Sequence, residues 1–130
     1  MNQTILNTGT QLTGRALISA IFIMAGINKI GGYAGTQGYM ESVGVPGILL
    51  PLVIVLEIGA GLAVLIGWQT RVAAFLLAGF ALLSALLFHL NFGDQMQSIL
   101  FMKNLAMAGG LLFLVTAGPG NWSVDALRKT

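Results

Sequence analysis

The chain contains four long apolar segments, and this pattern restricts its fold more than any other feature. The segments cover approximately residues 12–30, 47–66, 71–92 and 98–117. A helix needs about 20 mostly apolar residues to cross the hydrocarbon core of a bilayer. Each segment reaches or approaches that length, and glycine or proline follows each one within a few residues. The sequence therefore predicts an all-α fold, an integral membrane bundle of four transmembrane helices.

Composition supports a membrane protein and excludes several other classes. Of the 130 residues, 56% are hydrophobic and 8% are charged, whereas soluble domains are about 25% charged. The length predicts one domain over residues 1–130. The sequence has no cysteine, which excludes disulfides and thiolate metal sites. Its six basic residues are scattered and form no patch for nucleic acid.

Basic residues near the ends of the segments predict the orientation in the membrane. One side holds Arg15, Arg71, Arg128 and Lys129. The other side holds Lys29 and Lys103 with the acidic Glu41 and Asp94. Because cytoplasmic loops carry the excess of Lys and Arg, both termini are predicted to be cytoplasmic. The two tryptophans fall near the first side and the two tyrosines near the second, as expected for aromatic belts.

Five polar side chains lie within or at the ends of the predicted spans, all in the outer half or near the midplane. They are Lys29, Glu57, His89, Lys103 and Asn104. A charge at the bilayer centre costs at least about 2.5 kcal/mol, so such groups usually face the bundle interior and find partners. We expect these residues to form a buried polar cluster, which is the candidate ligand site.

The depths of the charged residues predict which of them pair. At a rise of 1.5 Å per residue, Glu57 lies about 15 Å and Lys103 about 8 Å below the outer surface. The difference is within the combined reach of the two side chains, so Lys103 is the expected partner of Glu57. Two alternatives stay open, namely a protonated Glu57 and a Glu57 bound to Lys29 or His89. A lysine at a span end also commonly extends toward the headgroups.

Aromatic residues beside the cluster predict the wall of a pocket. They are Phe88, Phe92 and Phe101. The single histidine has no companion ligands for a metal, and the sequence establishes no base for Ser19, Ser84 or Ser98. No catalytic residue is assigned, and a self-contained enzyme is not expected.

Two packing features complete the prediction. The connection between residues 31 and 46 is the longest, and Tyr33, Tyr39 and Met40 are expected to rest against the interface or the pocket. The alternative is a mobile loop, because the segment contains five glycines. Small residues four positions apart allow helix backbones to approach closely. These pairs are Gly59 with Ala63, Ala74 with Ala78, Ala81 with Ala85, and Ala106 with Gly110.

Several short motifs resemble those of the DoxX family over residues 15–125. They are Phe22-Ile-Met-Ala-Gly-Ile-Asn-Lys29, Gly44-Val-Pro46, Glu57 with Gly59 and Gly61, Gly67-Trp-Gln-Thr-Arg71-Val-Ala-Ala74, Phe88-His89, Phe101-Met-Lys-Asn104, Gly109-Gly110 and Ser123-Val-Asp125. The resemblance implies four transmembrane helices in a bacterial inner membrane and an association with redox metabolism. Some relatives look like membrane subunits of thiosulfate:quinone oxidoreductases or partners of sulfur and detoxification enzymes.

Three functions are consistent with these observations. The first is a membrane subunit or anchor of a quinone- or sulfur-linked redox enzyme. A quinone headgroup would then be bound by Lys103, His89 or Asn104, and Glu57 would handle protons. The second is a scaffold that holds a soluble redox enzyme through the tail, residues 121–130. The third is a small-molecule carrier, which would need a homo-oligomer because four helices make a thin wall.

Overall fold

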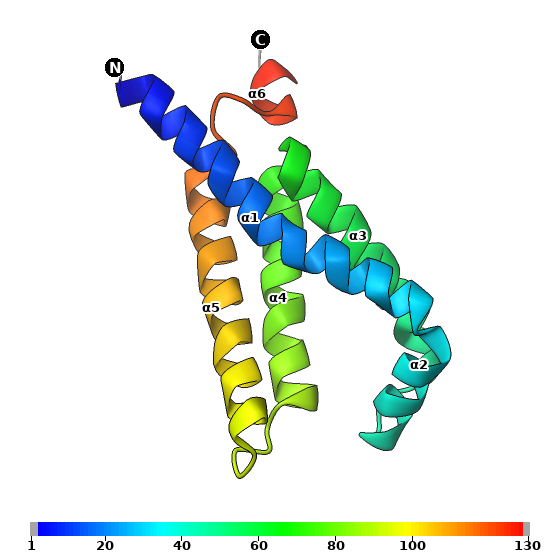
Figure 1. Cartoon of the computed structure of the whole chain (residues 1–130). Helices are drawn as coiled ribbons and strands as arrows, with labels where there is room; N and C mark the ends of the chain where they lie inside the picture. Colours follow the sequence, from blue (N-terminus) through cyan, green and yellow to red (C-terminus); the bar gives the residue numbers. More distant parts are fainter. Residues whose placement is uncertain (1–2, 129–130) are drawn as a thin grey trace.

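The computed structural model describes residues 3–128 and is entirely helical in this range (Figure 1). The elements are α1 (Gln3–Gly31), α2 (Tyr33–Ser42), the 3₁₀ turn η1 (Gly47–Leu49), α3 (Leu50–Ile66), α4 (Thr70–Phe88), α5 (Gln95–Ala117) and α6 (Val124–Arg128). Four helical segments are long and apolar enough to span a membrane: α1, η1 with α3, α4 and α5. The predicted fold class is confirmed.

The boundaries of two spans differ from the prediction. Helix α1 begins at Gln3 instead of near residue 12, because threonine, asparagine and glutamine lower the hydropathy of its first turns without ending the helix. Helix α4 ends at Phe88, four residues before the predicted end, and α5 begins at Gln95. The chain turns between them, where Asp94 caps α5 by accepting a hydrogen bond from the backbone of Met96 (3.0 Å).

Helices α1 and α3 pack closely because each contributes a glycine at their contact. A Cβ atom on Gly26 would lie 2.5 Å from Ile58, and one on Gly61 would lie 2.8 Å from Ile23. Both distances are too short for side-chain carbon atoms, so the two backbones approach as only glycine allows. This contact holds the second half of α1 against α3.

Helices α4 and α5 form the second close pair (Figure 1). The predicted small-residue pairs of α4 are buried, namely Ala74, Ala78, Ala81 and Ala85. In the other two pairs, Ala63 is buried, but Gly59 and Ala106 are exposed, and no group outside its own helix approaches Gly59. Residue spacing identifies a stripe of small residues. Whether another helix packs against that stripe depends on the arrangement of the neighbouring helices.

A set of polar contacts joins the helices at the α6 end of the molecule. Arg15 is 2% exposed, and its guanidinium donates hydrogen bonds to the carbonyl oxygens of Leu65 (3.0 Å), Val64 (3.3 Å) and Trp122. It therefore satisfies the last carbonyls of α3. Of the basic residues predicted on this side, Lys129 lies outside the described residues.

The α3–α4 turn is fixed by the segment that follows α5. The carboxylate of Asp125 accepts hydrogen bonds from the backbone N–H groups of Gln69 (2.8 Å) and Thr70 (2.9 Å). Gln69 has φ +46°, a left-handed conformation that is uncommon for residues other than glycine. The backbone N–H of Asp125 donates to the carbonyl of Gly67 (2.8 Å). Residues 122–125 therefore act as an internal clamp on the bundle.

Away from this clamp, the two helix pairs diverge. Figure 1 shows α1 crossing obliquely over the bundle and leaning with α3 away from α4 and α5 at the α2 end. The 29 residues of α1 make a helix about 43 Å long, longer than the roughly 30 Å hydrocarbon core, so α1 must tilt or protrude. The separation of the pairs leaves room for side chains to line a cavity.

Candidate functional site

A cavity of about 290 Å³ lies between the diverging helix pairs. Five helices contribute to its wall: α1, α2, α3, α4 and α5. The lining consists of Ile21, Phe22, Ala25, Lys29, Thr36, Tyr39, Met40, Val53, Glu57, Phe80, Ala81, Ser84, Phe88, His89, Asn104 and Met107. Four of the five predicted polar residues are therefore brought to one site, and the fifth, Lys103, is not.

One wall of the cavity carries an ion pair between α1 and α3. The Nζ atom of Lys29 lies 2.8 Å from Oε1 of Glu57. The Glu57 side chain is 4% exposed and that of Lys29 is 27% exposed. The predicted pairing of Glu57 with Lys103 is wrong. The close contact of α1 with α3 through Gly26 and Gly61 places Lys29 beside Glu57.

Lys103 lies on a different face of α5 from the cavity. It is exposed, and its neighbours in a shallow surface hollow are Gln95, Ser98, Ile99, Met102 and Ala106. Lys103 has neighbours at i+3 (Ala106) and i+4 (Met107), and only Met107 points inward. The predicted depth of Lys103 was compatible with a contact to Glu57. The direction in which the Lys103 side chain leaves the helix could not be predicted from residue spacing.

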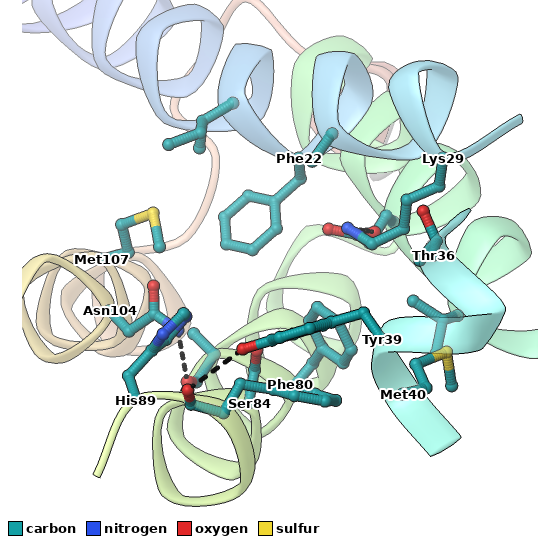
Figure 2. Close-up of a pocket in the computed structure, with 16 residues that line it drawn as sticks. Phe22, Lys29, Thr36, Tyr39, Met40, Phe80, Ser84, His89, Asn104 and Met107 are labelled. Atoms are coloured by element: carbon teal, nitrogen blue, oxygen red, sulfur yellow. Dashed lines mark hydrogen bonds and ion pairs between the residues drawn. The ribbon is translucent and has the colours of Figure 1, made fainter. Parts of the chain in front are cut away.

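The opposite wall carries polar groups without charge, from α4, α5 and the turn between them. Asn104 donates a hydrogen bond from Nδ2 to the carbonyl of Ala81 (3.1 Å). His89 donates from Nδ1 to Oε1 of Gln97 (2.8 Å), which leaves Nε2 as an acceptor in the neutral ring. Ser84 lies beside them. Figure 2 shows Asn104, Ser84 and His89 across the cavity from Lys29.

Aromatic rings occupy the space between the two polar walls. Phe22 is 3% exposed and projects from α1, and Phe80 and Phe88 come from α4 (Figure 2). Two of the three predicted aromatic residues do not line the cavity. Phe92 and Phe101 instead pack edge to face, with ring centroids 5.1 Å apart. The reason is the early end of α4, which places Phe92 in the connecting turn.

The segment between the first two spans forms part of the site. Instead of an irregular loop, residues 33–42 form helix α2. Tyr39 stacks on Phe88 (centroids 5.5 Å apart), and its hydroxyl donates to the Phe88 carbonyl (3.4 Å). Met40 is 4% exposed and lines the cavity, whereas Tyr33 does not. The predicted contact of Tyr39 and Met40 with the pocket is confirmed.

Sequence reasoning missed several lining residues, above all Phe22, Thr36, Phe80 and Met107. Phe22 was recoverable, because it precedes Lys29 by seven residues and so shares its helix face. Met107 follows Asn104 by three residues and Phe80 precedes Ser84 by four, so each shares a helix face with a polar lining residue and was also recoverable.

The charged groups of the described lining balance each other. Lys29 and Glu57 carry opposite charges and are in contact, and the remaining polar members are hydroxyls, an amide and an imidazole. Within residues 3–128 no group of three His, Asp or Glu side chains is arranged to hold a metal ion. The site is therefore suited to an uncharged molecule with an apolar body and hydrogen-bonding groups.

Comparison with known proteins identifies the family. Residues 10–90 match the sequence model of the DoxX family. The chain belongs to the DoxX family. It is 56% identical over 116 residues to the inner membrane protein YqjF of Escherichia coli K12, covering 89% of each chain. It is 36% identical over 121 residues to the inner membrane protein YphA of the same strain, covering 88% of this chain and 86% of that one. No solved structure gives a significant match.

The family assignment agrees with the helices of the structure. This DoxX protein is a multi-pass protein of the inner membrane, and its four long apolar helices lie in the lipid bilayer. The motif residues Lys29 and Glu57 meet as an ion pair. The motif residues Phe88, His89 and Asn104 line the same cavity.

Proposed function

We propose that this DoxX protein binds a quinone headgroup in the cavity and serves as the membrane subunit of a redox enzyme system. The observation that supports this most directly is the placement of polar groups at two opposed walls with aromatic rings between them (Figure 2). A quinone has the matching pattern, with a carbonyl oxygen at each end of a flat apolar ring. The cavity, at about 290 Å³, is near the lower limit of small-molecule pockets, roughly 300 Å³.

Each wall offers a hydrogen-bond donor for one carbonyl. The ammonium group of Lys29 has three donors, and the contact with Glu57 uses one of them. On the other wall, the Ser84 hydroxyl and the second N–H of the Asn104 amide are the candidate donors. Phe22 and Phe80 supply the apolar surface on which a flat ring packs.

Charge balance favours a quinone over a sulfur oxyanion. A small dianion needs cations or several free N–H donors, and the one lysine of the lining is already in contact with a carboxylate. The apolar lining would add the cost of removing that dianion from water. An uncharged, lipid-soluble headgroup carries neither cost.

Glu57 is the proton-handling group of the proposal. A bound quinone accepts electrons together with protons, so a group that can hold a proton must lie beside it. Glu57 lines the cavity, and its Oε1 atom lies 2.8 Å from Nζ of Lys29. The second carboxylate oxygen is thus the position at which a proton would be held.

Binding of a ubiquinone analogue to the purified protein tests the proposal. Wild-type protein in detergent should quench or shift the signal of a short-chain ubiquinone saturably. Ser84→Ala combined with Asn104→Leu should weaken binding about tenfold or more, because two donors are lost at about 1 kcal/mol each. Lys103 lies on α5 outside the cavity, so Lys103→Met should leave the affinity unchanged. Absence of saturable binding by the wild type would refute the proposal.

We also propose that both termini are cytoplasmic and that a soluble redox enzyme is the partner. In this orientation the cavity lies in the outer half of the membrane.

The scaffold alternative assigned docking to residues 121–130. Trp122 and Asp125 are engaged in the internal clamp, and the side chains of Leu127 and Arg128 in α6 are exposed. Loss of a co-purifying enzyme on replacing these two residues would favour the scaffold.

A further inference from the structure

We infer that the ligand carries a long apolar tail and reaches the cavity sideways from the bilayer, between α1 and α5. This inference rests on the proposed function and adds the class of ligand and its route. The reason is a difference between the sides of the cavity. Close helix packing or bulky side chains cover several of them, whereas the side between α1 and α5 is lined by Met107 and by Ile21, which is 49% exposed.

Helices α1 and α5 touch at one crossing and separate beyond it. At the crossing, a Cβ atom on Gly110 of α5 would lie 3.1 Å from the side chain of Ile18. One turn further along α1, Ile21 lines the cavity and yet is 49% exposed. Met107 is the α5 residue one turn away from Gly110, and it also lines the cavity. Figure 1 shows the two helices diverging from this point toward the α2 end.

Packed residues cover three other sides of the cavity. Between α1 and α3, the contacts at Gly26 and Gly61 leave no gap for a ligand. Between α4 and α5, Ala81 and Ala85 are at most 1% exposed. At the α2 end, Tyr39 bridges to Phe88, and Met40 is almost fully buried. A molecule that enters through the α1–α5 gap displaces only side chains, whereas entry between α1 and α3 or between α4 and α5 requires those helices to separate.

The gap opens at a depth where the surroundings are acyl chains. Ile21 lies six residues from Arg15, which is level with the end of α3, and this corresponds to about 9 Å along the helix. The exposed neighbours on this part of α1 are Leu17 and Met24, both apolar. Because the cavity has room for a headgroup and little more, a tail attached to it must leave through this gap and lie in the lipid.

A side-chain replacement at the gap tests the route. Ile21→Trp should fill the gap, and Ile27→Trp is the matched control, because Ile27 is similarly exposed (48%) on α1 but does not line the cavity. The probes are a ubiquinone with a two-isoprenoid tail and the same headgroup without a tail. Ile21→Trp should weaken binding of the tailed probe at least tenfold and that of the headgroup much less. Ile27→Trp should change neither.

Photo-cross-linking to the wild-type protein gives a second measurement that does not depend on folding of a variant. A tailed ubiquinone with a diazirine on its first isoprenoid unit should label the peptides that contain Ile21 and Met107. Labelling of α2 around Tyr39 would overturn the inference and leave the proposed function standing. Equal binding of the tailed probe to Ile21→Trp and Ile27→Trp would do the same. If neither probe binds the wild type, the proposed function fails and the inference fails with it.

Discussion

At the scale of single residues, the ion pair between Lys29 and Glu57 makes the firmest prediction. Glu57 is buried, so Glu57→Gln leaves Lys29 without its partner, and Lys29→Met leaves a buried carboxylate unpaired. Breaking a buried pair costs about 3–5 kcal/mol, and the 27% exposure of Lys29 places the expected loss near the lower end. The double variant should be more stable than Lys29→Met, as measured by thermal unfolding in detergent.

Lys103→Met is the matched control for this cycle. Lys103 has the same charge and lies exposed on α5, so its replacement should change stability by less than about 0.5 kcal/mol. Equal destabilisation by Lys103→Met and Lys29→Met would contradict the pairing seen in the structure. Strictly additive losses for Lys29→Met and Glu57→Gln would also contradict it, because residues in contact show coupling.

Asp125 predicts a pH dependence outside the membrane. Partial burial by itself raises the pKa of Asp125, but hydrogen bonds from Thr70 and Gln69 and the attraction of Arg128 outweigh it, so its pKa lies below the ordinary 3.8. Because the folded pKa is the lower one, the carboxylate stabilises the fold above pH 4 and loses this effect as the pH falls further. Wild type should exceed Asp125→Asn in stability at pH 7 by about 0.5–2 kcal/mol, the value of a helix cap.

The stability difference between wild type and Asp125→Asn is the quantity to follow with pH. Other carboxyl groups titrate in the same range, but they are common to both proteins and cancel in the difference. The difference should shrink in the range below about pH 4, from the ordinary pKa of the carboxyl group downward, because the folded pKa is the lower of the two. A difference that stays constant over this range would show that the charge of Asp125 does not stabilise the α3–α4 turn.

At the scale of elements, the α3–α4 turn depends on one glycine. Gly67 has φ +77°, and a Cβ atom there would lie 2.6 Å from the guanidinium of Arg15 and even closer to Ser123. Gly67→Ala should therefore cost the strain of a left-handed residue, about 1–2 kcal/mol, and also disturb the clamp. Gly79→Ala is the control, since nothing lies near Gly79 and alanine favours a helix by about 0.5–1 kcal/mol. Chemical unfolding in detergent compares the two, and equal stability would contradict the clamp.

The same scale shows what the sequence could predict. The four spans follow from hydropathy, because apolar length alone decides whether a helix crosses the bilayer. Helix α2 was not predicted, since its two glycines and its polar residues give no apolar stripe of its own. Helix α2 instead makes tertiary contacts. Tyr39 stacks on Phe88, and the Gln37 side chain donates a hydrogen bond to the carbonyl of Gly47 (3.2 Å).

Four of the polar members of the site could be predicted, and the pairing of Glu57 could not. Buried charge in lipid is so costly that Lys29 and Glu57 could be singled out from their positions in the sequence. Pairing depends on how far α1 tilts and on the direction in which each side chain leaves its helix. Lys103 and Asn104 are adjacent in the sequence, but Asn104 lines the cavity and Lys103 lies on another face of α5. That rotation is set by packing against α4, which the sequence pattern does not specify.

At the scale of the whole molecule, the clamp and the cavity lie at opposite ends of the bundle. Arg15, Gly67 and Asp125 tie the helices together at one end. At the other end α1 and α3 separate from α4 and α5, and the cavity forms in the space between them. A bundle held along its whole length would have no room for a ligand. The clamp therefore holds the helices together at one end while the end near α2 stays open.

Because the clamp and the cavity lie at opposite ends of the bundle, the proposed orientation predicts the side of the membrane on which each of them lies. Arg15 is buried and bonded within the bundle, so Arg71 and Arg128, both exposed at the α6 end, carry the topological signal among the described residues. The chain has no cysteine, so single cysteines report on each side. In intact cells a membrane-impermeant maleimide should label Asn91→Cys, in the exposed α4–α5 turn, but Asn121→Cys only after permeabilisation. The reverse pattern would place the cavity in the cytoplasmic half and overturn the proposed topology.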